Sequence, residues 1–168
     1  MSVLEHKREA PYRVNCAIIT VSDTRTVEND KSGKLISTLL EENGHQISFY
    51  KIVKDDGTSI EAAIEEASGV EQVNVILMTG GTGISKRDVT IETVSALFEK
   101  EIVGFGELFR MLGYMEDIGS AAIMSRACAG TFRNKAVFVM PGSSGAVKLA
   151  MEKLILKEIG HVVRELNK

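Results

Sequence analysis

Short apolar stretches alternate along this chain with stretches whose apolar residues recur every three or four positions. The apolar stretches have the length of strands, and those at 14–21, 47–53, 73–79 and 136–140 are predicted as strands. The first is apolar enough to be buried on both faces, which is typical of inner strands in a parallel sheet. Strands that alternate with helices predict an α/β fold with a largely parallel sheet and right-handed crossovers.

The helices are recognised by apolar residues at helical spacing and by signals at their ends. The first helix closes at Asn43-Gly44, a common helix end. The second begins at Thr58, which has Glu61 three residues later in the form of a capping box. Apolar spacing predicts helices around the segments 35–40, 58–67, 91–98 and 146–166.

The remaining segments decide the expected domain organisation. Segment 104–112 is predicted as a loop running into a helix, and 118–127 as a short strand or helix. Residues 1–13 form a polar N-terminal arm, either a disordered tail or an oligomer contact. The chain of 168 residues shows no internal repeat or linker and is long enough to bury a sizeable core. Residues 14–168 are therefore predicted to form a single domain.

Composition and charge narrow the classes of partner. The hydrophobic fraction of 44% and the charged fraction of 26% are ordinary for a globular protein. A net charge of −3 provides no basic field, so neither nucleic acid nor a membrane surface is expected as a partner. No stretch approaches the ~20 apolar residues that cross a membrane, and the polar arm lacks the apolar centre of a secretory signal. The expected location is cytoplasmic. Cys16 and Cys128, in apolar or small-residue surroundings, are predicted as buried free thiols.

The segment 79–90 carries the strongest chemical signal. The third predicted strand ends in Thr79-Gly80-Gly81-Thr82-Gly83, and a helix is predicted shortly afterwards. A glycine turn between a strand and a helix presents backbone N–H groups to an anion. The turn is not a Walker A loop, and Lys86 stands where a dinucleotide fingerprint requires its last glycine. From this pattern alone, a structural turn and an anion site remain equal alternatives.

Asp88 favours the anion site. A carboxylate beside a phosphate would repel it unless a cation lay between them, which indicates a phosphate bound with Mg²⁺. The alternative is that Asp88 caps the helix that follows. The two roles do not exclude each other.

Polar segments follow each of the four predicted strands. In an open α/β sheet, ligands bind beyond the carboxyl ends of the strands. Each segment alone would be an ordinary loop, but two glycine-containing turns and two acidic clusters at one edge fit a phosphate ligand with a divalent cation. The segments are Ser22-Asp23, Asp55-Asp56, 79–88 and 141–144.

Other candidate residues carry weaker signals. The three histidines, at positions 6, 45 and 161, are scattered along the sequence and are predicted as surface residues rather than a zinc site or a catalytic base. Ser143 lacks the surrounding residues of a nucleophile elbow. Arg110 and Arg126 either contact an anion or, as is commoner, are exposed or ion-paired.

Several of these residues form motifs that resemble those of the MoaB/MogA family of molybdopterin-binding proteins. The resemblance runs from about residue 14 to 150, and it is closer to the MoaB branch. The glycine loop becomes specific when it is joined to the other motifs. In order, they are Thr20-Val21-Ser22-Asp23, Thr79-Gly80-Gly81-Thr82-Gly83 with Arg87-Asp88-Val89-Thr90, Gly104-Phe105-Gly106-Glu107 with Phe109-Arg110, Ser125-Arg126-Ala127, and Met140-Pro141-Gly142-Ser143.

The resemblance implies a three-layer α/β/α sandwich around a mostly parallel sheet, and a homotrimer or homohexamer. It implies binding of molybdopterin, a pterin that carries a dithiolene and a terminal phosphate, and contact with the molybdenum-insertion enzyme. Active members of the family are molybdopterin adenylyltransferases, which use Mg-ATP to place AMP on that phosphate. The alternative is a non-catalytic molybdopterin carrier or scaffold, and a generic nucleotide-binding domain is a third reading.

The resemblance also implies roles for individual residues. Asp55 and Asp88 are the expected catalytic carboxylates and Mg²⁺ ligands, with Asp56 as the alternative to Asp55. Some relatives have lost the Asp-Val-Thr part of the loop and are inactive, whereas this chain keeps it at 88–90, which favours activity. The expected binding positions are Ser22, Asp23, Thr79, Gly80, Gly81, Thr82, Gly83, Ser125, Arg126, Pro141, Gly142 and Ser143.

Overall fold

The fold is built on a six-stranded sheet with the order β2-β1-β3-β6-β5-β4. The computed structural model describes residues 2–168. The four predicted strands are present and mutually parallel, so the prediction of a mostly parallel sheet is confirmed. They are β1 (Asn15–Val21), β2 (Gln46–Val53), β3 (Val75–Thr79) and β6 (Lys135–Met140).

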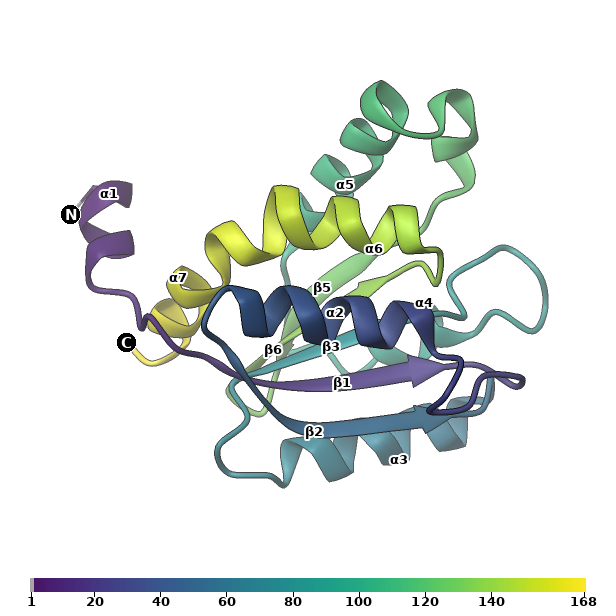
Figure 1. Cartoon of the computed structure of the whole chain (residues 1–168), viewed down its shortest axis with the longest axis horizontal. Coiled ribbons are helices and arrows are strands. Elements are labelled where there is room, and N and C mark those ends of the chain that lie inside the picture. Colours follow the sequence, from purple (N-terminus) through teal and green to yellow (C-terminus); the bar gives the residue numbers. More distant parts are fainter. Residues whose placement is uncertain (1) are drawn as a thin grey trace.

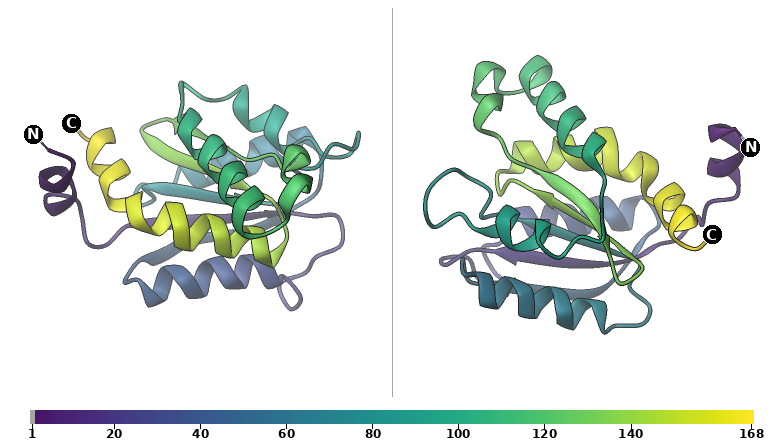
Figure 2. Two further views of the ribbon diagram at one scale, coloured as in Figure 1. Left: turned by 90° about the horizontal axis from the view of Figure 1, so that it is seen from above. Right: turned by 180° about the vertical axis from the view of Figure 1, so that it is seen from behind.

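Helices cover both faces of the sheet and make three layers (Figure 1). One face carries α2 (Lys31–Glu42), α5 (Val103–Glu116) and the C-terminal helices. The other carries α3 (Gly57–Ser68) and the short α4 (Thr90–Ser95). The two views of Figure 2 show the sheet between these layers. The expected three-layer α/β/α architecture is therefore confirmed.

The two faces of the sheet contribute to two separate hydrophobic cores. Successive residues of a strand point to opposite faces, and in β1 this places Ile18 in the core beneath α2 and Ile19 in the core above α3. Both side chains are fully buried. Burial on both faces explains why the sequence of β1 is apolar at nearly every position rather than at alternate positions.

The C-terminal helix contains an irregularity that the apolar spacing did not predict. It comprises α6 (Ser144–Ala150), a π-helical turn (Met151–Ile155) and α7 (Leu156–Leu166). Met151 and Ile155 within the π-helical turn are both buried. A π-helical turn adds a residue to one helical turn. It therefore shifts the apolar side of α7 relative to that of α6.

Strands β4 (Lys100–Glu101) and β5 (Cys128–Phe132) extend the sheet in the antiparallel sense and were not predicted. The sequence of β5 is rich in small residues, which are weak strand formers. Gly130 is required there because a Cβ atom would lie 2.4 Å from the ring of Phe98. Gly130 therefore leaves room for the ring of Phe98, a tertiary contact that the local sequence does not reveal.

Two segments outside the sheet also differ from expectation. Segment 118–127 forms a 3₁₀ helix, η1 (Gly119–Met124), which packs beside α5 and projects with it from the body of the protein (Figure 1). The N-terminal arm contains the helix α1 (Val3–Arg8), which lies against α7. The possibility of a disordered tail is therefore wrong for the part of the arm that the structure describes.

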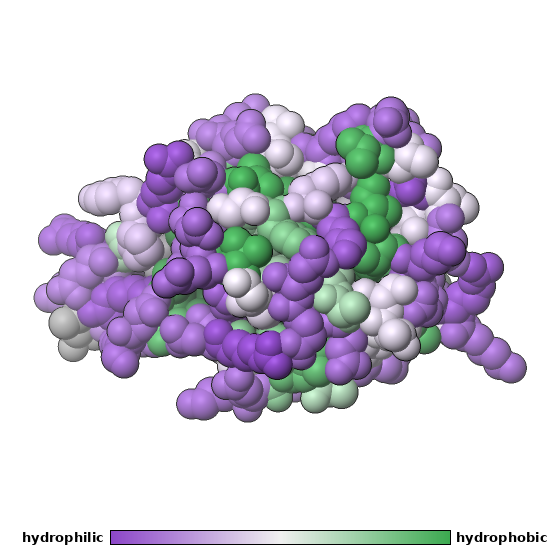
Figure 3. Space-filling view, turned by 90° about the horizontal axis from the view of Figure 1, so that it is seen from below, coloured by the Kyte–Doolittle hydropathy of each residue, from purple (hydrophilic) through white to green (hydrophobic). Residues whose placement is uncertain are grey.

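The surface is mostly polar on the side of α3. Seen from below, toward this layer, it is mainly hydrophilic with smaller hydrophobic areas between the polar side chains (Figure 3). Within residues 2–168, every helix is too short or too polar to span a bilayer.

Candidate functional site

The predicted site segments start side by side because they follow neighbouring parallel strands. The Ser22 amide donates to the carbonyl of Val53 at 2.8 Å, at the ends of β1 and β2. The Gly80 amide donates to the carbonyl of Met140 at 3.1 Å, at the ends of β3 and β6. These bonds continue the sheet by one residue into each pair of loops. All four segments therefore begin at one edge, the right-hand edge in Figure 1.

The glycine loop fits closely between β1 and α4. Gly80 and Gly81 have positive φ angles of 100° and 66°, which glycine adopts far more readily than other residues. A Cβ atom on Gly80 would lie 2.2 Å from the carbonyl oxygen of Val21. One on Gly81 would lie 2.2 Å from Thr90 Oγ1 and 2.9 Å from Asp55 Oδ1. The amide of Gly80 is already used by the sheet, so the amides of residues 81–83 are those relevant to an anion.

Asp55, and not Asp56, faces this loop. Asp55 Oδ2 accepts from the Asp23 amide at 3.2 Å, and the Asp55 amide donates to Asp23 Oδ1 at 3.0 Å. Asp56 is the N-cap of α3 and accepts from the Ser59 amide at 2.8 Å. The predicted capping box at Thr58 is therefore wrong, because the helix begins at Gly57 and uses the preceding aspartate. A helix cap and a site carboxylate are adjacent in sequence but turn to different neighbours.

Asp88 lies at the other end of the loop. Its Oδ2 accepts from the Ser85 hydroxyl at 2.7 Å and would lie 2.6 Å from a Cβ atom on Gly83. Helix α4 begins at Thr90 with Val89 at its N-cap and no side-chain capping bond. The alternative that Asp88 caps this helix is therefore wrong. Its carboxylate instead closes a turn beside the glycines.

The charge of Asp88 acts on Asp55. Burial raises the pKa of Asp55, and the negative charge of Asp88 raises it further. A like charge nearby destabilises an ionised carboxylate. Arg87, which the site prediction did not include, forms an ion pair with Asp23 rather than with either of these groups. A cation bound between Asp55 and Asp88 would therefore relieve the repulsion between their charges.

Thr90 is a further polar residue of this site. It is fully buried, and its Oγ1 has no hydrogen-bond partner among residues 2–168. Buried hydroxyl groups are normally satisfied. The sequence placed Thr90 in a family motif but offered no sign that its hydroxyl would be buried against Gly81.

Arg126 holds the glycine loop in place. Its Nε donates to the carbonyl of Thr82 at 2.9 Å and its Nη2 to the carbonyl of Gly83 at 2.6 Å, while Glu92 of α4 pairs with the same guanidinium. Arg110 also bonds to backbone, donating to the carbonyl of Ala127 at 3.4 Å. Both arginines therefore bind their own chain, and the planar fork of Arg126 matches two successive carbonyls.

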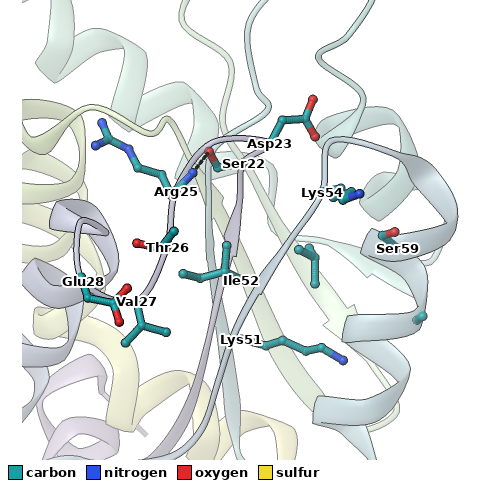
Figure 4. Close-up of a pocket in the computed structure, with 12 residues that line it drawn as sticks. Ser22, Asp23, Arg25, Thr26, Val27, Glu28, Lys51, Ile52, Lys54 and Ser59 are labelled. Atoms are coloured by element: carbon teal, nitrogen blue, oxygen red, sulfur yellow. Dashed lines mark hydrogen bonds between the residues drawn. The ribbon is translucent and has the colours of Figure 1, made fainter.

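Several of the binding positions predicted from the sequence line cavities, whereas Gly81, Thr82, Gly83 and Arg126 are not among the lining residues. Ser22, Thr79, Gly80 and Gly142 line a cavity of about 290 Å³. Ser22 and Asp23 also line a larger one of about 710 Å³, between the segment after β1 and strand β2. Figure 4 shows Ser22 and Asp23 at one end of the larger cavity and Lys51 at the other. Volumes in this range are typical of small-molecule sites.

Ser125, Pro141 and Ser143 lie around a third cavity, of about 230 Å³, toward α5 and η1. Ser143 is the N-cap of α6, and its hydroxyl accepts from the Ala146 amide at 3.3 Å. The predicted residues that line cavities therefore form two groups, one beside the segment after β1 and the other toward α5 and η1. Gly142, which follows Pro141, lines the cavity of Gly80, and a Cβ atom on Gly142 would lie 3.4 Å from Gly80 Cα.

A buried aspartate supports the segment after β1. Asp30 is 1% exposed, accepts from the Thr20 hydroxyl at 2.7 Å and from Tyr50, and caps α2. Burial and the bond to Asp30 raise the pKa of Tyr50. Sequence analysis missed this group, because Asp30 lies ten residues from Thr20 and twenty from Tyr50 with no motif linking them.

The two cysteines are not among the reactive groups. Cys16 and Cys128 are buried free thiols, as predicted. Burial raises the pKa of Cys16 to about 12 and that of Cys128 to about 11. Thiols with such pKa values are unreactive at neutral pH.

Comparison with known proteins identifies relatives over the whole chain. Residues 17–161 match the family described as a probable molybdopterin binding domain. Over all 168 residues, the chain is 62% identical to molybdenum cofactor biosynthesis protein B of Bacillus cereus and covers 99% of that protein. The protein of the same name from Bacillus subtilis is 61% identical over the same length and coverage.

Solved structures agree with the sequence matches. A crystal structure of molybdenum cofactor biosynthesis protein B, 62% identical, superposes with a TM-score of 0.92 over 95% of this chain and 99% of that one. The tungsten cofactor synthesizing protein MoaB from Pyrococcus furiosus, 39% identical, gives 0.85 over 95% and 100%. The match over most of the chain, the full-length relatives and the shared fold show that this chain belongs to the MoaB/MogA family of molybdopterin-binding proteins.

Proposed function

We propose that this protein acts in molybdenum cofactor biosynthesis, where it binds molybdopterin and transfers AMP from Mg-ATP to the terminal phosphate of molybdopterin. The names of the full-length relatives support the pathway. The catalytic part rests on one observation: Asp55 and Asp88 lie at the two ends of a glycine loop, and the charge of Asp88 raises the pKa of Asp55.

The residues of this site fit a divalent cation. Mg²⁺ is usually held by one or two carboxylates together with water and phosphate oxygens, and Asp55 and Asp88 offer such a pair. Thr90 Oγ1 lacks a partner among the described residues and lies close to Gly81, beside Asp55. When bound, Mg²⁺ would neutralise negative charge on the transferring phosphoryl group. Hard oxygen ligands of this kind are the ones that Mg²⁺ prefers.

In the proposed reaction, a phosphate oxygen of molybdopterin attacks the α-phosphorus of ATP, and pyrophosphate leaves. A phosphate monoester is largely ionised at neutral pH, because its second pKa is about 6. The chain therefore need not supply a general base. Its contribution is to position the two reactants and to stabilise charge. The amides of residues 81–83 are the proposed phosphate donors, and Arg126 fixes their orientation through the carbonyls of Thr82 and Gly83.

The cavities beside the loop supply room for the two substrates. Ser22 lines both the cavity of about 290 Å³ and the one of about 710 Å³, so the two adjoin. Arg25 and Lys54 line the larger cavity and bring positive charge to a chain whose net charge is −3. Local cations of this kind favour the approach of an anionic ligand.

We also propose a homo-oligomer, a trimer or hexamer, and contact with the molybdenum-insertion enzyme. Large apolar side chains of α5 and η1 are exposed, including Met111, Tyr114, Met115 and Ile123, the last at 87%. Exposed apolar groups on one projecting unit mark an interaction surface. The proposed location is the cytoplasm, where ATP is available.

Measurement of AMP transfer tests this function. Purified protein is incubated with molybdopterin, ATP and Mg²⁺, and both pyrophosphate and the adenylylated pterin are followed. Product should form only with Mg²⁺ and should disappear in Asp88→Asn while pterin binding persists. Pterin binding without product in the unmodified protein would instead establish a carrier or scaffold. ATP binding without pterin affinity would support a generic nucleotide-binding domain.

A further inference from the structure

Two histidines from opposite ends of the chain lie side by side. His6 is in α1 and His161 is in α7, and the two chain ends are adjacent in all views of Figures 1 and 2. Their rings pack edge to face with centroids 5.6 Å apart. Their side chains are only 19% and 20% exposed. The two histidines, scattered in the sequence, are therefore neighbours in the fold.

Glu165 completes a group of three candidate metal ligands. Its Oε1 lies 3.3 Å from His6 Nδ1 and 3.9 Å from His161 Nε2. All three ligand atoms lie within 4.8 Å of one another. Ligand atoms that share a tetrahedral zinc ion lie roughly 3.3 Å apart, given metal–ligand distances of about 2.0 Å. Small side-chain rotations would therefore close the group around one ion.

Glu158 orients His161 for such a role. His161 Nδ1 lies 3.0 Å from Glu158 Oε2. When Nδ1 donates a hydrogen bond to this carboxylate, the lone pair of Nε2, the ring nitrogen on the side of Glu165, is left for a metal ion. Metal-bound histidines commonly have a carboxylate on the other ring nitrogen. The arrangement of His161 between Glu158 and Glu165 matches this pattern.

Two cations contact Glu165, and a metal ion would have to compete with them for its carboxylate. Arg164 contacts Glu165 but also donates to Glu9, at 2.5 Å and 3.2 Å. Lys168 contacts Glu165 at 2.8 Å with a side chain that is 53% exposed. Lys7 pairs with Glu158 rather than Glu165. Of the two, Lys168 is the more exposed, and the contact between Lys168 and Glu165 is therefore the one that a metal ion would replace more readily.

We infer that His6, His161 and Glu165 bind a divalent transition-metal ion, Zn²⁺, that links the two ends of the chain. Two imidazoles and one carboxylate suit Zn²⁺ and do not suit Mg²⁺, which prefers oxygen ligands. This site is separate from Asp55 and Asp88 and does not depend on the proposed function. Helix α1 has no buried residue among 3–8, so polar contacts and this pair of rings hold it to α7. A bound ion would strengthen that attachment.

The test titrates the full-length protein, without any histidine tag, with ZnCl₂ by calorimetry and with Co²⁺ by visible absorption. We expect one site per chain, a tetrahedral Co²⁺ spectrum, and a Tm that rises with Zn²⁺. His6→Gln and His161→Gln should each abolish the spectrum and the Tm rise. Glu158→Gln keeps all three ligands and should weaken binding about tenfold or more.

His45→Gln is the matched control, because His45 lies outside the group and contacts the Val14 amide. It should leave Zn²⁺ binding unchanged, as should excess Mg²⁺. Binding that survives in the double variant His6→Gln/His161→Gln would overturn the inference. So would an unmodified protein that binds Zn²⁺ no more tightly than this double variant, or one whose binding Mg²⁺ displaces.

Discussion

Asp23 and Asp55 exchange hydrogen bonds across the ends of β1 and β2, the amide of each donating to the carboxylate of the other. These two hydrogen bonds connect two loops whose aspartates are 32 residues apart in the sequence. They also turn the carboxylate of Asp55 toward Gly81, while Asp56 turns away to cap α3. The candidate site is therefore organised by contacts between loops and not within one motif.

Replacement of the two neighbouring aspartates should separate the site role from the capping role. We expect Asp55→Asn to reduce AMP transfer by at least about 100-fold, a loss comparable to that of an important charge-stabilising group. Asp56→Asn should retain activity, because asparagine also caps helices well. AMP transfer assayed on both proteins at saturating Mg²⁺ checks this. Equal losses in both variants would contradict the assignment of Asp55.

Gly81→Ala should destabilise the protein by more than its φ angle alone explains. A positive φ costs a non-glycine residue roughly 1–2 kcal/mol, and the added methyl group would also clash with Thr90 and Asp55. Gly44→Ala is the control, because Gly44 has a φ of 81° but nothing within 4 Å of its Cβ position. Urea denaturation should show a loss for Gly81→Ala about 1–3 kcal/mol larger than for Gly44→Ala. Equal losses would argue against close packing of the loop.

Arg126→Lys should loosen the glycine loop while preserving the charge. Lysine cannot reproduce a planar contact with the carbonyls of Thr82 and Gly83 together with Glu92. We expect weaker ATP binding and slower AMP transfer, by about tenfold or more, as for a displaced positioning group. Arg133→Lys, at an exposed ion pair with Glu65 far from the loop in the fold, should change neither. An active Arg126→Lys variant would show that the loop does not need this support.

The raised pKa of Asp55 predicts a pH-dependent effect on stability. The pKa of Asp55 is higher in the folded protein than in the unfolded chain. As pH rises through the ordinary aspartate pKa, the unfolded chain therefore loses this proton first, and the free energy of unfolding falls. Asp55→Asn should therefore stabilise the metal-free protein at pH 7. The advantage should fade as pH falls below the ordinary aspartate pKa of about 4. Thermal unfolding at several pH values without Mg²⁺ checks this, and an advantage that grows toward acid pH would contradict it.

Much of the fold could be predicted because it depends on local patterns. Three of the four parallel strands, β1, β3 and β6, are largely apolar because helices cover both of their faces, and such runs are visible in the sequence. The edge strand β2 is more exposed, but it still carries enough alternating apolar residues to be predicted. By contrast, β5 is rich in small residues and packs Gly130 against Phe98, and α1 and its C-cap form ion pairs with α7. Neither has a local signal strong enough to reveal it.

The order of apolar and polar residues in this chain was sufficient for the parallel α/β sheet and for the edge where the polar loops gather. These features follow from periodicity and from the rule that parallel strands end together. Three relationships are determined only by the tertiary structure. Asp55 rather than Asp56 faces the glycines, Arg126 binds carbonyls of the glycine loop, and His6 packs against His161. Each of these relationships joins side chains from distant segments, and their directions depend on packing that no local pattern encodes.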